Sequence, residues 1–171
     1  LKGLLKSAIR DDNPVFVLWH KAMFDLSDYV PNGDCTIPLG EAAVRREGTD
    51  LTLVAYSLVA HRALDAAERV APRCSVEVID PRTLNPFDLA TVLNSVRKTG
   101  RLLVVHESPG RCGVGADIVR QVVEHAFSSL KTAPRVLAGA DLPIPFAKPL
   151  ENACVPQTDD IVKAIEAAIA N

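Results

Sequence analysis

The sequence has no excess of charge of either sign and no long apolar run. Its 19 Lys and Arg residues nearly balance 21 Asp and Glu residues, and the formal net charge is −2. A chain without a positive surplus has no electrostatic basis for binding nucleic acid or an anionic membrane surface. No stretch approaches the roughly 18 to 20 apolar residues of a membrane-spanning helix. We therefore expect neither nucleic acid nor a membrane as a partner.

Cysteine is also scarce, and the cysteines stand singly. They are Cys35, Cys74, Cys112 and Cys154. There is no CxxC pair and no Cys–His spacing typical of a zinc site, and the four histidines form no short-range pair. In a chain of 171 residues without an export signal, we expect reduced thiols. These patterns predict no metal site, and Cys74 is expected to be a small core residue.

The first residues, LKGLLKSAIRDD, lack the apolar core and the cleavage site of a signal peptide. They also lack an initiating Met, so we expect a fragment of a longer chain. Apolar residues recur at helical spacing over 1–9, and Asn13-Pro14 ends that helix. An apolar strand is expected over Val15–Trp19, with no sheet of its own to join. Residues 1–24 thus resemble the end of a preceding domain, and the Pro- and Gly-containing stretch 25–41 is interpreted as a linker.

From residue 42 onward, short apolar runs alternate with amphipathic segments. Strands are predicted at 42–47 (a short edge strand), 51–56, 76–79, 102–105 and 135–138. Helices are predicted at 60–71, after Asp88 up to Gly100, at 115–130 (the longest), and from Asp159-Asp160 to near the C-terminus. This alternation predicts an α/β fold, a three-layer sandwich around a mostly parallel sheet of about five strands. Residues 42–171 form this predicted domain.

A glycine-rich loop, GRCGVG at 110–115, lies between a predicted strand and a predicted helix, where backbone N–H groups can hold a phosphate. Its spacing is GxxGxG, which differs from the dinucleotide-binding GxGxxG, and no Walker Lys-Ser/Thr follows. Gly110, Gly113 and Gly115 are therefore interpreted first as a tight turn that permits close packing. An anion site, or a contact between subunits, is the alternative.

Polar residues also end two predicted strands. His106 and Glu107 are adjacent on a strand, so their side chains point to opposite faces and do not form a catalytic dyad by themselves. We expect them to fix the strand end or to line an interface. Arg82, after Asp80-Pro81, is able to receive a carboxylate or phosphate. An ion pair with Asp80, or with a carboxylate of a neighbouring subunit, is the favoured interpretation.

The order of several segments resembles a known family. They are GLLKSAIRDDNPVFVL (3–18), EGTDLTLVAY (47–56), EVIDPRTLNPFD (77–88), TGRLLVVHE (99–107), GVGADI (113–118) and GADLPIPFAKPLE (139–151). This series resembles the end of the pyrimidine-binding domain, the linker and the transketolase-like C-terminal domain in the β subunit of thiamine diphosphate-dependent 2-oxo acid dehydrogenases. The pyruvate, branched-chain 2-oxo acid and acetoin types all belong to that family.

The resemblance implies that the parent enzyme decarboxylates a 2-oxo acid on thiamine diphosphate with Mg²⁺ and acylates a lipoyl group. In that family the activating glutamate lies upstream of the matched region, and the α subunit holds the diphosphate. The cofactor signature Gly-Asp-Gly is missing here, since Gly33-Asp34 is followed by Cys35. We therefore assign no catalytic, cofactor-binding or metal residue, expect no cofactor on this fragment, and predict that it is inactive alone.

The implied partners are the α subunit, a second β subunit and the acyltransferase (E2) core, in a homodimer or a heterotetramer. The predicted contact sites are the bend at 131–134 and the tail at Asn171. Relatives often carry Leu-Asp-Ala-Pro at the bend, whereas Lys131 reverses that charge here, which disfavours a basic partner surface. Pro143, Pro145 and Pro149 suit a rigid, extended segment. The implied compartment is the cytoplasm for a bacterial protein and the mitochondrial matrix for a eukaryotic one.

Two other interpretations remain open from the sequence. One is the C-terminal domain of another thiamine enzyme, such as transketolase or deoxyxylulose phosphate synthase. The other is a stand-alone anion- or nucleotide-binding α/β module that uses the loop at 110–115.

Overall fold

The computed structural model describes residues 1–27 and 29–170, and its centre is a five-stranded sheet. The strands are β1 (Ala43–Arg46), β2 (Leu51–Ala55), β3 (Val76–Asp80), β4 (Leu102–Pro109) and β5 (Arg135–Gly139). Their spatial order is β1-β3-β2-β4-β5, with β1 antiparallel to β3 and the other pairs parallel. Every residue of β2 is buried, as expected for a central strand with both faces covered.

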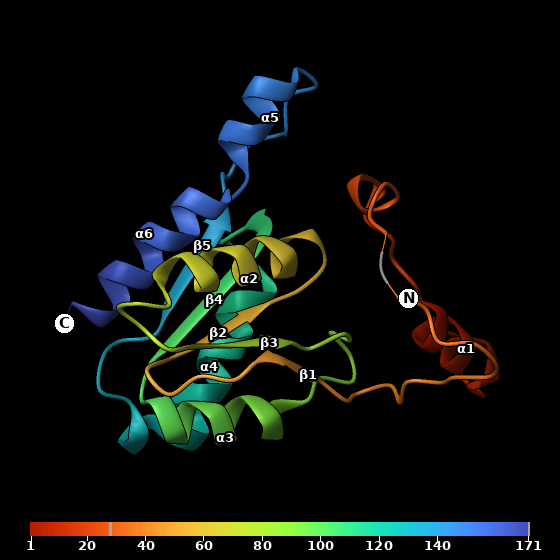
Figure 1. Ribbon diagram of the computed structural model, residues 1–171, viewed down its shortest axis with the longest axis horizontal. Coiled ribbons are helices and arrows are strands. Elements are labelled where there is room, and N and C mark those ends of the chain that lie inside the picture. The colour runs from red at the N-terminus through yellow and green to blue at the C-terminus, as the bar shows by residue number, and fades with distance from the viewer. Residues whose placement is uncertain (28, 171) are drawn as a thin grey trace.

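Helices cover both faces of the sheet (Figure 1). They are α2 (Leu58–Val70), α3 (Leu89–Thr99), α4 (Val114–Ala126) and α6 (Thr158–Ile169), whereas α5 (Lys148–Cys154) projects beyond the sheet and has no buried residue. The helices α2 and α6 pack together on one face, and α3 and α4 pack together on the other. The predicted fold class, a three-layer α/β sandwich around a mostly parallel sheet, is confirmed.

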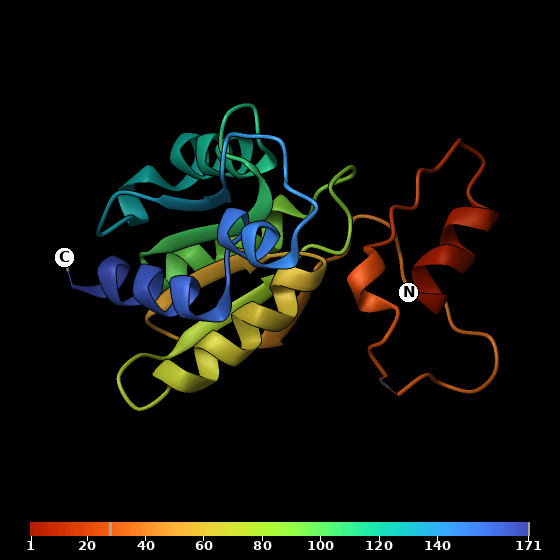
Figure 2. The ribbon, with the colours of Figure 1, turned by 90° about the horizontal axis from the view of Figure 1, so that it is seen from above.

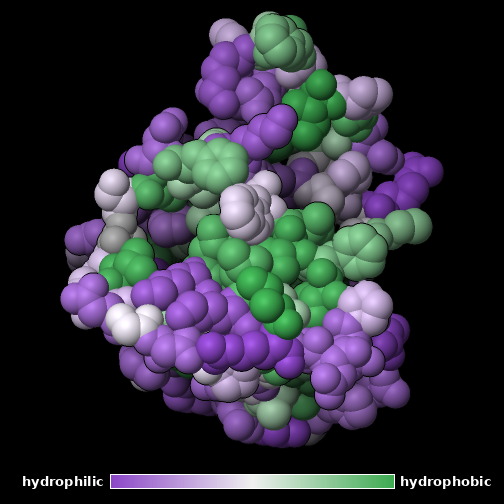
Figure 3. All heavy atoms as spheres, turned by 90° about the vertical axis from the view of Figure 1, so that its right-hand side faces the viewer, coloured by the Kyte–Doolittle hydropathy of each residue, from purple (hydrophilic) through white to green (hydrophobic). Residues whose placement is uncertain are grey.

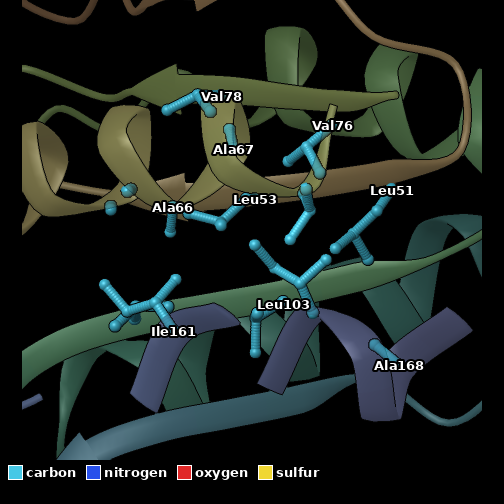
Figure 4. Close-up of a cluster of buried hydrophobic side chains, with 14 of the residues drawn as sticks. Leu51, Leu53, Ala66, Ala67, Val76, Val78, Leu103, Ile161 and Ala168 are labelled. Atoms are coloured by element: carbon cyan, nitrogen blue, oxygen red, sulfur yellow. The ribbon is translucent and has the colours of Figure 1, made fainter. Parts of the chain in front are cut away.

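Each face of the sheet has its own apolar core. The larger one joins α2 and α6 to the sheet through fully buried residues such as Leu53, Leu103 and Ile161 (Figure 4). Cys74 belongs to this core, as predicted. The second lies under α3 and α4 and includes Val54 and Val104. Consecutive residues of β2 thus serve opposite cores, because side chains alternate across a strand.

Residues next to α3 and α6 explain where these helices begin or end. Asp88 accepts a hydrogen bond from the Thr91 backbone N–H at 3.0 Å and begins α3. Gly100 ends α3 at φ 75°, a left-handed conformation that costs a residue without Cβ very little. At α6, the side chains of Gln157 and Asp160 form a reciprocal capping box.

The N-terminal part lies beside the sandwich as a separate unit (Figure 2). It contains α1 (Lys2–Arg10) and the short 3₁₀ helix η1 (Lys21–Met23). Contacts to the following stretch hold α1: Lys6 and Arg10 both pair with Asp34, and Gly3 packs against Ile37. Among the residues described, no helix is long and apolar enough to cross a membrane.

Three sequence-based expectations are wrong. Val15–Trp19 forms no strand, because within the described chain it has no neighbouring strand; Phe16 is 91% and Leu18 88% exposed. The helix predicted over 115–130 ends at Ala126, continues as the 3₁₀ helix η2 (Phe127–Ser129), and at 13 residues equals α2 in length. The proline-rich segment is not extended throughout, since α5 lies within it. Pro149 stands in the first turn of α5, where its missing N–H has no helical partner to lose.

Candidate functional site at the carboxyl edge of the sheet

The strand order defines one special position in the sheet. From β2 the chain crosses to β3 on one side, and from β3 it crosses back to β4 on the other side of β2. The carboxyl ends of β2 and β4 therefore form the topological switch point, the place where open α/β sheets bind ligands. In this chain the residues there are Tyr56 and Ser57 after β2, and His106 and Glu107 in β4.

His106 is fully buried at the switch point. Its ring stacks on the Tyr56 ring with centroids 6.4 Å apart and planes inclined by 21°. The Nδ1 atom lies 2.9 Å from both the carbonyl oxygen and the hydroxyl of Ser108, and Nε2 has no hydrogen-bond partner among the described residues. Burial lowers the pKa of His106, and the hydrogen bond to the Ser108 carbonyl only partly opposes this.

Tyr56 is held in its neutral form as well. Burial raises the pKa of the Tyr56 phenol, a hydrogen bond with the Ser108 side chain opposes the rise, and the nearby Glu107 carboxylate adds to it. The two stacked rings thus form an uncharged polar pair that joins the ends of β2 and β4.

The glycine-rich loop packs directly against this imidazole. A Cβ atom on Gly113 would lie 2.5 Å from the Pro109 carbonyl oxygen and 2.9 Å from His106 Cε1. A Cβ on Gly115 would lie 2.6 Å from His106 Nε2. Gly110 is different, because a Cβ there would meet only Ala138, at an ordinary 3.4 Å. Gly113 and Gly115 therefore make room for the histidine ring, and an anion site in this loop stays a prediction.

Glu107 points away from His106 and joins three parts of the chain. Its carboxylate accepts hydrogen bonds from His20 Nε2 at 2.8 Å and from Arg62 Nη1 at 3.3 Å. The same Arg62 nitrogen donates to the Pro156 carbonyl at 2.8 Å. Glu107 thus connects the N-terminal segment, α2 and the connection before α6. The absence of a His106–Glu107 dyad agrees with strand alternation.

The other predicted residues lie outside this cluster. The Arg82 backbone N–H donates to the Asp80 carboxylate at 2.9 Å with Arg82 at φ 58°, and no ion pair of its side chain is found within residues 1–27 and 29–170. The ion pair between the Asp80 and Arg82 side chains is therefore not formed, and the Asp80 carboxylate instead accepts the Arg82 backbone N–H; the alternative, a pair with a carboxylate of a neighbouring subunit, stays a prediction. Lys131 Nζ donates to the Thr99 carbonyl at 3.1 Å, at the end of α3. Asn171 lies outside the described residues.

Sequence reasoning missed Tyr56, Arg62 and His20. Tyr56 had a usable signal, since it directly follows a buried strand at the sheet edge that binds ligands. Arg62 and His20 had none, because they reach Glu107 across 45 and 87 residues of chain.

Two shallow hollows elsewhere on the domain do not coincide with the switch point. One, of about 290 Å³, lies between β5 and the start of α6 and is lined by Leu137, Cys154 and Asp160 among others. The other, of about 330 Å³, contains Glu77, which is paired with Lys98. Burial opposes ionisation of Glu77, but hydrogen bonds led by Lys98 hold its pKa below the usual value. In the described part of the chain, no group of three or more His, Cys, Asp or Glu side chains is placed to hold a metal ion.

Comparison with known proteins assigns this architecture to a class. The family model "Transketolase, C-terminal domain" matches residues 40–161, and the chain belongs to that family. It is 44% identical over 168 residues to the mitochondrial pyruvate dehydrogenase E1 component subunit beta of Dictyostelium discoideum, covering 95% of this chain and 47% of the relative. It is 43% identical over 164 residues to the acetoin:2,6-dichlorophenolindophenol oxidoreductase subunit beta of Cupriavidus necator, covering 95% and 48%.

The resemblance to dehydrogenase β subunits is therefore confirmed, and the chain spans about half the length of the curated relatives it matches. A solved structure described as a split gene transketolase, inactive beta4 tetramer, has the same fold. Its TM-score is 0.70 at 24% identity, covering 84% of this chain and 46% of that one.

Proposed function

We propose that this chain is the C-terminal part of the β subunit of a 2-oxo acid dehydrogenase decarboxylating (E1) component, and that it serves subunit assembly. The observation that carries the proposal is the extent of the similarity. More than 40% identity covers 95% of the chain, and so includes residues before the α/β domain. We accordingly propose residues 1–24 as the end of a pyrimidine-binding domain, 25–41 as a linker and 42–171 as the assembly domain.

The proposed parent enzyme oxidatively decarboxylates a 2-oxo acid with thiamine diphosphate and Mg²⁺ and acylates lipoyl groups. The described residues do not fit the Mg²⁺ ion. Mg²⁺ requires oxygen ligands at fixed positions, and no suitable cluster of acidic side chains is found among them. We therefore propose no catalytic residue in this chain and expect it to be inactive by itself. By the same resemblance, its compartment is the cytoplasm in a bacterium and the mitochondrial matrix in a eukaryote.

Exposed apolar side chains support an assembly role. One group lies in the N-terminal segment and includes Phe16 and Leu18, on a face where apolar side chains gather (Figure 3); with the proposed domain boundaries, the rest of the pyrimidine-binding domain would cover this group. A second group lies before and within α5, where Phe146 is fully exposed, Ile144 is 56% exposed and Leu150 is 57% exposed. Apolar groups of this size at a surface are typical of protein interfaces. The proposed partners are a second β subunit, the α subunit and the acyltransferase (E2) core.

The alternatives have weaker support. The fold shared with a split gene transketolase is also expected for other thiamine enzymes, but the sequence identity there is only 24%. A stand-alone anion-binding module would use the loop at 110–115, and two of its glycines are already in close contact with His106.

The test is the mass of the purified chain by light scattering, with and without thiamine diphosphate and Mg²⁺. We expect a dimer, at twice the chain mass of 18.4 kDa. Its mass and melting temperature should be the same with and without the cofactor. The Phe146→Ser variant should shift the population toward monomer, because it removes a large apolar side chain from the proposed contact.

The matched control is Phe127→Ser, which removes a 71% exposed phenylalanine from η2, in a different part of the fold. A monomer that the cofactor strongly stabilises would contradict the proposal, since it would require a binding site in this fragment.

A further inference from the structure

The switch point already has an occupant, and it is a segment of the same chain. His20 Nε2 lies 2.8 Å from the Glu107 carboxylate in β4. Three residues further on, the Met23 sulfur accepts a hydrogen bond from the Ser57 hydroxyl, which directly follows β2, at 3.7 Å. Residues 20–23 therefore contact the carboxyl ends of both central strands, at the position where related folds hold small ligands.

The His20 ring is oriented by its own helical turn. Its Nδ1 accepts the Ala22 backbone N–H at 3.2 Å, and His20 is the N-cap of η1. With Nδ1 accepting, the ring proton is on Nε2 and is directed at Glu107. On either side of η1, Trp19 and Phe24 meet edge to face with centroids 6.0 Å apart. The segment thus presents one preorganised donor to the sheet edge.

The receiving carboxylate is preorganised by the domain. Arg62 on α2 binds Glu107 and is itself fixed by the Pro156 carbonyl. The Glu107 and Arg62 side chains are only 22% and 19% exposed, so the carboxylate is largely shielded from water. A charge-assisted hydrogen bond in such surroundings is stronger than one between exposed neutral groups.

From this geometry we infer that the switch point of this sheet is a binding site for residues 20–23, with Glu107 as the positioning residue that fixes the N-terminal segment to the α/β domain. The site accepts a single helical turn that begins with a histidine donor. While this turn is bound, the position that other open α/β sheets offer to small ligands is filled. The inference does not depend on the proposed function, because its test observes only the contact between segment and domain.

The chain contains one tryptophan, Trp19, which is 49% exposed and directly precedes His20, so its fluorescence reports on the contact. The first variant is Glu107→Gln, which keeps the side-chain shape and removes the charge. We expect stronger acrylamide quenching of Trp19 and about tenfold faster amide hydrogen exchange over residues 20–24, because a charge-assisted hydrogen bond is replaced by a neutral one. The amides of β2 and β4 should exchange at unchanged rates.

The control is Glu124→Gln, which removes the same charge from an exposed i,i+4 pair with Arg120 on α4. A second variant, His20→Ala, changes only the segment and so does not depend on how well the domain tolerates changes at Glu107. If both act through one contact, the double variant should be no worse than the more severe single one. Quenching and exchange in Glu107→Gln equal to those in Glu124→Gln would overturn the inference, and so would fully additive effects of His20→Ala and Glu107→Gln.

Discussion

His106 and Glu107 are neighbours in sequence with opposite environments. The first is an uncharged imidazole under two glycines, and the second is a carboxylate between two donors from other parts of the chain. Strand alternation places them on opposite faces, which the sequence alone predicts. One side chain is neutral and the other charged because the two faces of β4 contact different parts of the chain.

Burial of His106 gives the protein a pH-dependent stability. The native imidazole stays neutral because its pKa is lowered, whereas the unfolded one titrates near pH 6.5. As pH falls below that value, the unfolded chain takes up a proton that the native chain does not, so the free energy of unfolding falls by up to about 1.4 kcal/mol per pH unit. Above that pH the contribution is fully present.

This is measured by urea unfolding at pH 7 and at pH 5. The loss of stability between the two should be smaller in His106→Gln than in the parent chain, although the variant is less stable throughout. His125→Gln, an exposed change on α4, serves as the control. Equal losses in the parent and in His106→Gln would show that the imidazole is protonated in the native state.

Gly115→Ala tests the close packing of the glycine-rich loop against the His106 ring. The added Cβ would lie 2.6 Å from His106 Nε2 and 2.8 Å from Val136 Cγ1, so the loop or the ring must shift. We expect a loss of about 1–3 kcal/mol in the free energy of unfolding, despite the better helix propensity of alanine. Gly110→Ala meets only an ordinary contact and should change stability by less than about 0.5 kcal/mol. Equal urea midpoints for the two variants would contradict this account of the loop.

At the scale of single elements, helix ends that depend on adjacent residues are predicted well, whereas strands that depend on pairing with a distant segment are not. The beginning of α3 at Asp88 and its end at Gly100 follow from residues next to the helix, and both are observed. The segment Val15–Trp19 has a strand-like sequence, but a strand exists only where another strand pairs with it. The helix α5 was missed because the prolines around it obscure its short apolar pattern.

The end of α3 also gives Lys131 a structural role. Its ammonium donates to the Thr99 carbonyl, and its stem packs over Gly100. A cation at a helix C-terminus is favourable, so Lys131→Asp should cost about 1 kcal/mol in urea unfolding at low salt. The loss should shrink at high salt, where the charge is screened.

Lys131→Met is the control, because it keeps most of the stem and removes the charge. If the aspartate and methionine variants are equally stable at low salt, the charge at this position has no structural role. The bend would then remain only a candidate contact surface.

At the scale of the whole molecule, the sheet and its layers are predictable because each strand and helix has a clear apolar pattern. The strand order, which creates the switch point, cannot be predicted from the sequence of any single segment. The placement of His20 against Glu107 is beyond sequence reasoning for the same reason, since it depends on two parts of the chain that meet only after the sandwich has formed.

The position of β2 in the centre of the sheet has a consequence for synthesis of the chain. One neighbour of β2, the strand β3, follows it within 30 residues of chain. The other neighbour, β4, comes much later in the sequence, since Thr52 of β2 pairs with Leu102 of β4. During translation, one edge of β2, a strand whose residues are all buried in the folded domain, therefore stays unpaired until β4 has emerged from the ribosome. Unpaired strand edges of this kind favour aggregation of nascent chains. Folding of this domain is thus expected to be slow, and the interval before β4 emerges is the stage most exposed to aggregation.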